Sequence, residues 1–332
     1  MQSTLQPKTS SDEISFVYER LYRSPRYYSE LLLKIKTKEA QIKPLIYNRS
    51  QKYLYSVVQK MRIEGRPVRI VCVKVRQLGV TTVVSSIIHH HSSTRSNVTS
   101  MVSSHDLDSS ENIHRMYKLF HDMTDDCFKP MSKYSNRKEL LFENPDEATR
   151  KKSPGLNSRI MVETSNNTSL GRSFTVQNFH GSEVAFWNDP EKVMMGVEEA
   201  VPNLPGTSIF LESTANGIGN YFHKKCEQAF RKKSDYRLVF IPWFWDEGYM
   251  VEARDVKIDR LCDHDKAEFG NEKYLYRELG VTKRQLQWRR NKIETSYEGN
   301  IDSFAQEYPS TWQEAFIFSG QPLFNTKILL GM

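Results

Sequence analysis

The chain has 332 residues, of which 38% are hydrophobic and 26% charged, as is typical of a soluble globular protein with one large or two ordinary domains. It contains no run of about 18 apolar residues and its N-terminus has no apolar core, so we expect neither a membrane span nor a secretory signal. The net charge of +7 suits an anionic partner, for which DNA is the natural candidate. The four cysteines lie far apart with no C-x-x-C pair, which argues against zinc and against a disulfide scaffold and favours the cytoplasm.

Helical patterns occupy the first part of the chain. Residues 12–38 are predicted to be helical and belong to an N-terminal helical segment at 1–40. A further helix is expected at 50–64. Ser50 is suited to cap the N-terminus of this helix, and Gln51, in its first turn, is placed to project outward.

The stretch from residue 68 to residue 82 is the most informative part of the chain. An apolar, β-branched run predicts a buried strand at 67–75, which leads through a short loop holding Gly79 into a helix at 81–93. Strand, glycine loop, threonine and helix form the layout of a P-loop, in which backbone N–H groups and a helix N-terminus bind phosphates and a hydroxyl holds Mg²⁺. The sequence therefore predicts a nucleotide site here, with Thr81 as the metal ligand.

This loop departs twice from the usual G-x-x-x-x-G-K-[ST] pattern. Lys74 stands where the first Gly belongs, and Val80 stands where the Lys belongs. A phosphate site needs a cation. Lys74 and Arg76, on the strand side of the loop, are the candidates because they can reach the β- and γ-phosphates from the other end. The predicted nucleotide-binding residues are Gln51, Lys74, Arg76, Gln77, Gly79, Thr81 and Thr82.

Beyond the loop, strands and helices alternate. Strands are predicted at 97–104, 158–164, 174–180, 206–214 and 236–243, and helices at 107–123, 190–201 and 221–233. Residues 130–157 are polar, contain Pro130, Pro145 and Pro154, and are interpreted as an irregular insertion. The alternation predicts an α/β fold with a mostly parallel sheet flanked by helices and the ligand at the carboxyl ends of the strands. Together with the glycine loop at 74–82, this indicates a P-loop NTPase fold of the ASCE/RecA-like type.

Polar residues follow two of these strands. The strand at 174–180 leads to Glu183, and a carboxylate at the end of this strand polarises the attacking water in P-loop motors. Ser182 stands where an Asp is usual, which leaves the second protein ligand of the metal open. The strand at 206–214 ends in short hydrogen-bonding side chains that can report the loss of one phosphate, namely Ser213, Thr214 and Asn216.

Two other regions complete the pattern. His89, His90 and His91 are consecutive on a predicted helix and face different directions, so we interpret them as structural or surface residues and not as a metal site. After Trp243 the alternation weakens, with helical segments around 266–279 and 282–295. We therefore predict a P-loop core at 41–243 and a C-terminal lid subdomain with a linker at 244–332.

The motif at 74–82, Lys-x-Arg-Gln-Leu-Gly-x-Thr-Thr, resembles the variant Walker A motif of the large terminase subunit, the ATPase that pumps DNA into tailed-phage capsids. Three later segments are similar to further motifs of that family. Ser182 to Trp187 resembles its catalytic motif, Ser213 to Gly217 its coupling motif, and E-Y-P…E-A-F at 307–316 its lid. The resemblance covers residues from about 40 to 325.

The resemblance implies roles for individual residues. Gln51, with Tyr47 as a lesser candidate, would read the adenine base. Glu183 would activate water, and Arg172, which follows Gly171, would enter the active site of a neighbouring subunit as an arginine finger. Together with Lys74 and Arg76, Glu183 and Arg172 form the predicted catalytic set.

The resemblance also implies activity and partners. We expect an ATPase that uses Mg²⁺–ATP to package viral double-stranded DNA, working as a homo-oligomeric ring on the procapsid in the host cytoplasm, with the portal protein and the small terminase subunit as partners. The nuclease of full-length relatives is expected on a separate domain or chain. Two alternatives remain: a helicase-like DNA translocase, and a catalytically inactive P-loop scaffold, which Val80 and Ser182 motivate.

Overall fold

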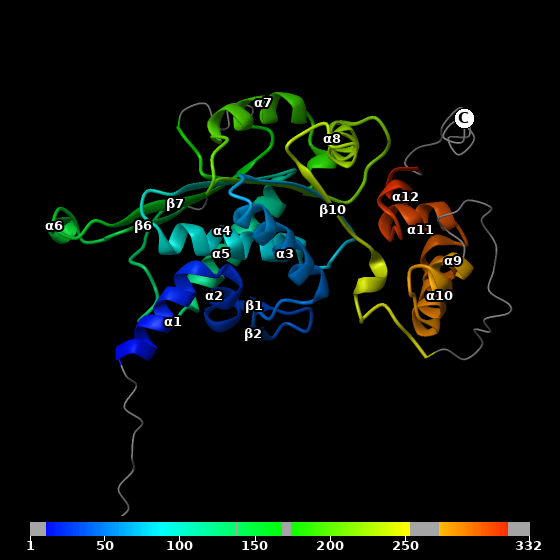
Figure 1. Cartoon of the computed structure of the whole chain (residues 1–332), viewed down its shortest axis with the longest axis horizontal. Helices are drawn as coiled ribbons and strands as arrows, with labels where there is room; N and C mark the ends of the chain where they lie inside the picture. The colour runs from blue at the N-terminus through cyan, green and yellow to red at the C-terminus, as the bar shows by residue number, and fades with distance from the viewer. Residues whose placement is uncertain (1–10, 137–138, 168–173, 253–271, 318–332) are drawn as a thin grey trace, which may run out of the picture. The chain divides into compact units, whose positions relative to one another are not determined.

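The computed structural model describes residues 11–136, 139–167, 174–252 and 272–317 (Figure 1). The chain divides into two compact units, each of which is built from three separate stretches of the sequence. Unit 1 comprises residues 1–47, 82–100 and 111–162, and unit 2 comprises residues 48–81, 101–110 and 163–332.

The centre of unit 2 is a set of parallel strands. Its strands lie in the order β10 (Arg237–Ile241), β3 (Val68–Lys74), β9 (Ser208–Ser213), β8 (Asn178–Ser182), and the three neighbouring pairs are all parallel. Every residue of β3, β8 and β9 is buried. This burial follows because helices cover both faces, as parallel sheets require.

Helices of unit 2 pack on the two faces of these strands. α8 (Tyr221–Phe230) contacts β3 and β10, and α3 (Arg49–Ile63) contacts β3. Figure 1 shows α7 (Pro190–Ala200) and α8 on one face and α3 on the other. The carboxyl ends of β3, β8 and β9 consequently meet at one edge of this layered structure, which is where a parallel sheet binds its ligands.

The sheet continues through two strands, each of which has residues in both units. β4 (Thr99–Ser104) lies beside β8, and β7 (Gly155–Thr164) lies beside β4. In unit 1, β7 pairs with β6 (Glu139–Glu143), and β6 with β5 (Lys133–Asn136), both antiparallel. The predicted α/β fold with a mostly parallel sheet flanked by helices is therefore confirmed.

The remaining elements of unit 1 are mainly helical. They are α1 (Ser11–Arg23), α2 (Pro25–Leu32), α4 (Val80–Thr94), α5 (Leu107–Asp122) and α6 (Glu147–Arg150), with the antiparallel pair β1 (Lys34–Lys36) and β2 (Ile42–Pro44). The first residues of α4 and of α5 belong to unit 2. His89 and His90 are buried here. The ring of His89 packs against Phe120 and Phe142, and Nε2 of His90 lies 2.8 Å from the carbonyl oxygen of Leu21. The structural interpretation of these histidines holds.

Several predicted elements of the N-terminal half are wrong. The single helical stretch at 12–38 breaks at Ser24, whose hydroxyl caps α2 just before Pro25, and the chain then turns into β1. The region 130–157 is not irregular, because it holds β5, β6, α6 and the start of β7. The cap of α3 is Asn48 and not Ser50. The strand predicted at 174–180 begins later and is β8, which ends at Ser182.

The C-terminal part of unit 2 is helical, as predicted. Between residues 272 and 317 it contains α9 (Glu272–Arg277), α10 (Lys283–Tyr297), α11 (Ile301–Glu307) and α12 (Trp312–Ile317). Trp288 of α10 stacks on Trp243 and on Tyr249, with ring centroids 5.4 and 4.6 Å apart. These ring contacts join α10 to the segment that follows β10. Within the described part of the chain, no helix has the length and apolarity needed to cross a membrane.

Candidate active site

The loop between β3 and α4 has the backbone of a phosphate-binding turn. β3 ends at Lys74 and α4 begins at Val80. Gln77 and Gly79 have left-handed φ values of +62° and +75°. A Cβ on Gly79 would lie 2.6 Å from Nε2 of Gln51, so a larger residue would displace the amide that donates to the Gly79 carbonyl. Turns of this kind aim successive backbone N–H groups at a bound anion.

The Gln51 side chain is hydrogen-bonded to this loop. Its Oε1 accepts a hydrogen bond from the Asn48 backbone N–H (2.9 Å), which completes a capping box, and its Nε2 donates to the carbonyl of Gly79 (3.0 Å). Gln51 is 4% exposed. The expectation that it projects outward is therefore wrong: the cap lies two residues earlier than predicted, which turns Gln51 inward. Tyr47 is also buried, and its hydroxyl is 2.6 Å from that of Ser86 within unit 1.

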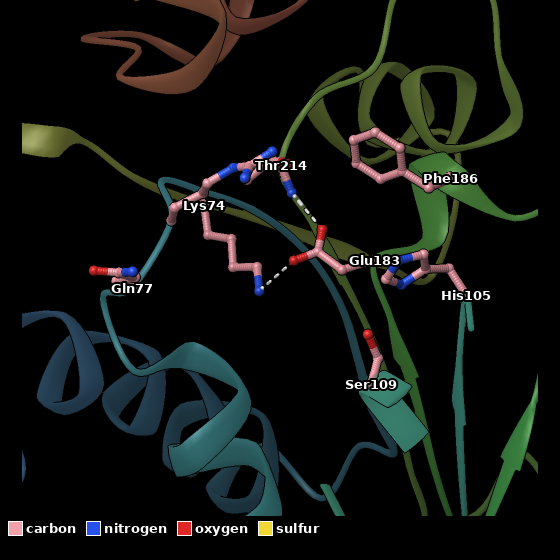
Figure 2. Close-up of a pocket in the computed structure, with 8 residues that line it drawn as sticks. Lys74, Gln77, His105, Ser109, Glu183, Phe186 and Thr214 are labelled. Atoms are coloured by element: carbon pink, nitrogen blue, oxygen red, sulfur yellow. Dashed lines mark hydrogen bonds and ion pairs between the residues drawn. The ribbon is translucent and has the colours of Figure 1, made fainter. Parts of the chain in front are cut away.

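Lys74 is the cation of the site, and two carboxylates surround it. Its Nζ lies 2.5 Å from Oε2 of Glu212, at the end of β9, and 3.0 Å from Oε1 of Glu183, after β8. Figure 2 shows Glu183 between Lys74 on one side and His105 and Phe186 on the other. Burial by itself would lower the pKa of Lys74, but Glu212 and Glu183 hold this pKa above its usual value. Lys74 is therefore charged although it is buried.

Glu212 is fully buried and connects three other side chains. The Thr81 hydroxyl donates to its Oε1 (2.9 Å), and Nε2 of His180 lies 3.2 Å from the same oxygen. Burial would raise the pKa of Glu212, whereas the Lys74 ammonium and then His180 keep this pKa below its usual value. The carboxylate is therefore ionised next to the first turn of α4.

Glu183 is held in a strained backbone conformation at the end of β8. Its φ of +54° is left-handed, which is rare for a residue with a side chain and is typical of functional sites. Its Oε2 accepts hydrogen bonds from the Ser213 hydroxyl and from the Thr214 backbone N–H, both 3.2 Å. Asn216 donates to the carbonyl of Ala185 at 3.1 Å. The three predicted coupling residues thus contact Glu183 or the turn that follows it.

Arg76 points toward the lid. Its Nε lies 2.6 Å from Oε2 of Glu307 in α11, and its backbone carbonyl accepts a hydrogen bond from the Tyr249 hydroxyl (3.2 Å). The Arg76 side chain is 62% exposed. The predicted contact of Arg76 with phosphates stays a prediction, and its partner in this structure is the Glu307 carboxylate of α11.

A cavity of about 360 Å³ opens over this cluster. Its lining residues are Lys74, Arg76, Gln77, His105, Ser109, Glu183, Phe186 and Thr214. Leu78 of the same loop lines a second cavity of about 610 Å³, together with Asn48, Arg49 and Trp245. Basic side chains and a turn rich in N–H groups beside a cavity make a site for a phosphorylated ligand.

The predicted residue Thr82 does not line the cavity over this cluster; it follows Thr81 in α4 and belongs to unit 1. The predicted arginine finger, Arg172, lies outside the described residues. Conversely, the sequence reasoning missed Glu212, His180 and His105. A signal for Glu212 was available, because a carboxylate inside the apolar run Ser-Ile-Phe-Leu-Glu-Ser is rarely buried unless it is paired or functional.

The residues present fit a magnesium–nucleotide site. In the part of the chain that the structure describes, no three His, Cys, Asp or Glu side chains come together as a metal cluster. Mg²⁺ does not need such a cluster, since it usually takes one or two carboxylates together with substrate phosphates and water. The Thr81 hydroxyl and the Glu212 and Glu183 carboxylates provide oxygen donors of this type around the Lys74 ammonium, itself a cation.

Comparison with known structures bears on the fold. No family model and no curated protein matches the sequence. The large terminase of bacteriophage HK97 superposes with a TM-score of 0.57 at 10% identity, over 88% of this chain and 54% of that protein. A mutant of the large terminase ATPase domain of Thermus phage P74-26 superposes with a TM-score of 0.51 at 12% identity, over 80% of this chain and 93% of that chain. The chain thus spans about half of the HK97 protein.

The parallel strands, the glycine loop after β3 and the helix that follows it place the fold in the P-loop NTPase class. Lys74 ends β3, Glu183 follows β8, and Thr81 lies in the first turn of α4. Lys74 and Glu183 line one cavity, and the Thr81 hydroxyl lies 3.4 Å from the Lys74 ammonium. Within this class, the fold is that of the ATPase domain of phage large terminases. The resemblance that the motif at 74–82 suggested is confirmed at the level of the fold.

Proposed function

We propose that this chain is the ATPase of a viral DNA-packaging motor, which hydrolyses Mg²⁺–ATP to drive double-stranded DNA into a procapsid. The observation that carries the proposal is the placement of Lys74 between Glu183 and Thr81 at the mouth of a cavity, within a terminase ATPase fold. Phosphoryl transfer needs positioning and charge stabilisation more than covalent chemistry, and this cluster supplies both.

Lys74 takes the role of the lysine that Val80 replaces. Its ammonium is 3.4 Å from the Thr81 hydroxyl, so it reaches the start of α4 from the end of β3. The N–H groups of the turn and the N-terminus of α4 bind the remaining phosphate oxygens. Bound Mg²⁺ would neutralise charge on the β- and γ-phosphates, with Thr81 as a protein ligand.

Glu183 is the general base that orients and polarises the attacking water. Two contacts to Ser213 and Thr214 fix its carboxylate at the floor of the cavity, and its left-handed backbone directs the side chain there. Because the same carboxylate is bonded to the coupling segment, a change at the γ-phosphate is passed directly to residues 213–216. Arg76 offers a second route, since its partner Glu307 belongs to the lid.

The second cavity is suited to the adenine base. Arg49 lies over the ring of Trp245, 4.7 Å from its centroid, and Tyr53 packs edge-on against the same ring. An aromatic face beside the phosphate loop is a typical surface on which a base stacks. Gln51 positions the loop between the two cavities, and its amide retains one N–H beyond the bond to Gly79.

The partners of the motor follow from the packaging role. The net charge of +7 suits the DNA backbone. We propose that subunits form a ring on the procapsid with the portal protein and the small terminase subunit, and that Arg172 acts across the interface between neighbours. The nuclease step of packaging is assigned to a separate domain or chain.

The test is hydrolysis of ATP with and without double-stranded DNA. Wild-type protein is expected to release phosphate in a Mg²⁺-dependent, DNA-stimulated reaction. Glu183→Gln keeps the size and hydrogen bonding of the side chain but cannot accept a proton, so ATP should bind while hydrolysis falls by at least 10²-fold. Glu227→Gln, on the outer surface of α8, is the matched control and should hydrolyse ATP normally.

Each alternative predicts a different result. An inactive scaffold would bind nucleotide without turnover in any variant. A helicase-like translocase would separate the strands of a forked duplex. Normal hydrolysis by Glu183→Gln would refute the assignment of the base.

A further inference from the structure

The strand next to β8 carries a buried carboxylate, Glu212, at the level of Ser182. Ser182, at the end of β8, occupies the position where P-loop motors usually carry the acidic residue. The strand register pairs Ser182 directly with Glu212 on β9. Paired residues on neighbouring strands point to the same face and are about 5 Å apart. Glu212 therefore presents its carboxylate on the same side of the sheet as position 182, one strand nearer to the phosphate loop.

The surroundings of Glu212 are those of a metal-associated carboxylate. The Thr81 hydroxyl donates to Oε1 of Glu212 at 2.9 Å, so the proposed metal ligand and this carboxylate are already in direct contact. His180 supports the same oxygen from the apolar interior at 3.2 Å. Metal sites commonly have such a second layer of hydrogen-bonding partners that orients the ligand.

A cation already occupies the space between these oxygens. The Lys74 ammonium lies 2.5 Å from Glu212, 3.0 Å from Glu183 and 3.4 Å from Thr81. A purely structural role for Glu212 would be to neutralise buried Lys74, a role that Glu183 shares. Charge balance does not require the additional contact to Thr81, whereas a shared metal site would bring these two oxygens together.

We propose that Glu212 replaces residue 182 as the acidic residue of the Mg²⁺ site, directly or through a metal-bound water. This inference rests on the proposed ATPase function and specifies the residue that Ser182 left open. Lys74 and Mg²⁺ cannot share one position, so binding of the metal requires the ammonium to turn toward the phosphates. Mg²⁺ is therefore expected to bind well only together with nucleotide.

The experiment measures metal binding and not turnover. The affinity for a fluorescent ADP analogue is determined with chelator and across a series of Mg²⁺ concentrations, and bound Mn²⁺ is counted by electron paramagnetic resonance in the presence of ADP. In wild-type protein, Mg²⁺ should tighten ADP binding. Glu212→Gln should weaken the apparent Mg²⁺ affinity by about 10–100-fold, as is typical for residues that support a metal site.

A position swap and a matched control sharpen the test. Ser182→Asp combined with Glu212→Ser returns the carboxylate to β8 and should recover most of the Mg²⁺ affinity that Glu212→Ser alone loses. Glu272→Gln removes another buried glutamate, which is ion-paired with Arg290 at 2.6 Å, and should leave Mg²⁺ affinity unchanged. Circular dichroism verifies that each variant is folded.

The outcomes are distinct. If Glu212→Gln is folded and keeps the wild-type Mg²⁺ affinity, the inference is wrong while the ATPase function stands. If wild-type protein binds no nucleotide at all, the proposed function itself fails. Should Glu212→Gln not fold, Glu212→Asp decides, because it keeps the buried charge but withdraws the carboxylate by one methylene: weakened Mg²⁺ binding supports the inference, and unchanged binding overturns it.

Discussion

Replacement of Lys74 by methionine tests the centre of the site. Lys74→Met keeps most of the volume of the side chain and removes its charge. In the wild-type protein the Lys74 side chain is 9% exposed, and its ammonium contacts Glu212 at 2.5 Å and Glu183 at 3.0 Å. The substitution therefore leaves two carboxylates unpaired, one of them in a fully buried position.

The magnitude follows from these contacts. Removal of one partner of a buried ion pair typically destabilises a protein by about 3–5 kcal/mol. The loss should be smaller in acid, because without the ammonium Glu212 can take up a proton and become neutral. Loss of a charge-assisted contact to phosphate, worth roughly 1.5–3 kcal/mol, should weaken nucleotide binding by about 10–100-fold.

The assays are urea unfolding at pH 5 and pH 8 and titration with an ADP analogue. Lys60→Met, on the exposed side of α3, is the control and should change neither quantity appreciably. If Lys74→Met binds nucleotide as tightly as the wild-type protein, Lys74 is not the displaced cation. If the free energy of unfolding is also unchanged, the buried ion-pair network is wrong.

Two further predictions concern the pH dependence of stability. Burial lowers the pKa of His89 from 6.5 to about 3, so the folded state resists protonation, and the contribution of this residue to stability is present above pH 6.5 and lost as the pH falls toward 3. His89→Phe, in a pocket of aromatic rings, should flatten the acid side of the stability curve measured by denaturant unfolding between pH 4 and 7; a curve as steep as that of the wild-type protein would contradict this. Burial raises the pKa of Glu314 from 4.5 to about 7, so its contribution is present below pH 4.5 and lost as the pH rises through 7. Glu314→Gln, which can still accept the Ser310 N–H, should be more stable than the wild-type protein at pH 8, by up to about 3 kcal/mol, and this difference should vanish at pH 4.5.

The strands around the site could be predicted because their signal is local. β3, β9 and β10 are short apolar runs, with β3 rich in β-branched residues, and the glycine loop after β3 has a recognisable pattern. β5 and β6 were missed because each is short and lies among prolines. In β6 only Leu140 and Phe142 are buried, which is too brief an alternation to distinguish a strand from a loop.

The contacts of the site depend on features that no local pattern contains. Gln51 turned inward because Asn48, two residues before the predicted cap, begins the helix. The bond between Arg76 and Glu307 joins residues 231 positions apart. The position of Glu212 beside Ser182 depends on strand register, and register is fixed by the packing of the whole sheet.

The left-handed backbone of Glu183 lowers the stability of the fold at a residue to which we assign a role in hydrolysis. A side chain in this conformation costs about 1 kcal/mol or more, whereas glycine adopts it without strain. Glycine at position 183 would relieve the backbone, and Lys74 would still have Glu212 as its partner. A laboratory screen that rewards only heat resistance would therefore tend to discard this glutamate. Retention of the glutamate at this position is what the proposed role of Glu183 as the general base predicts.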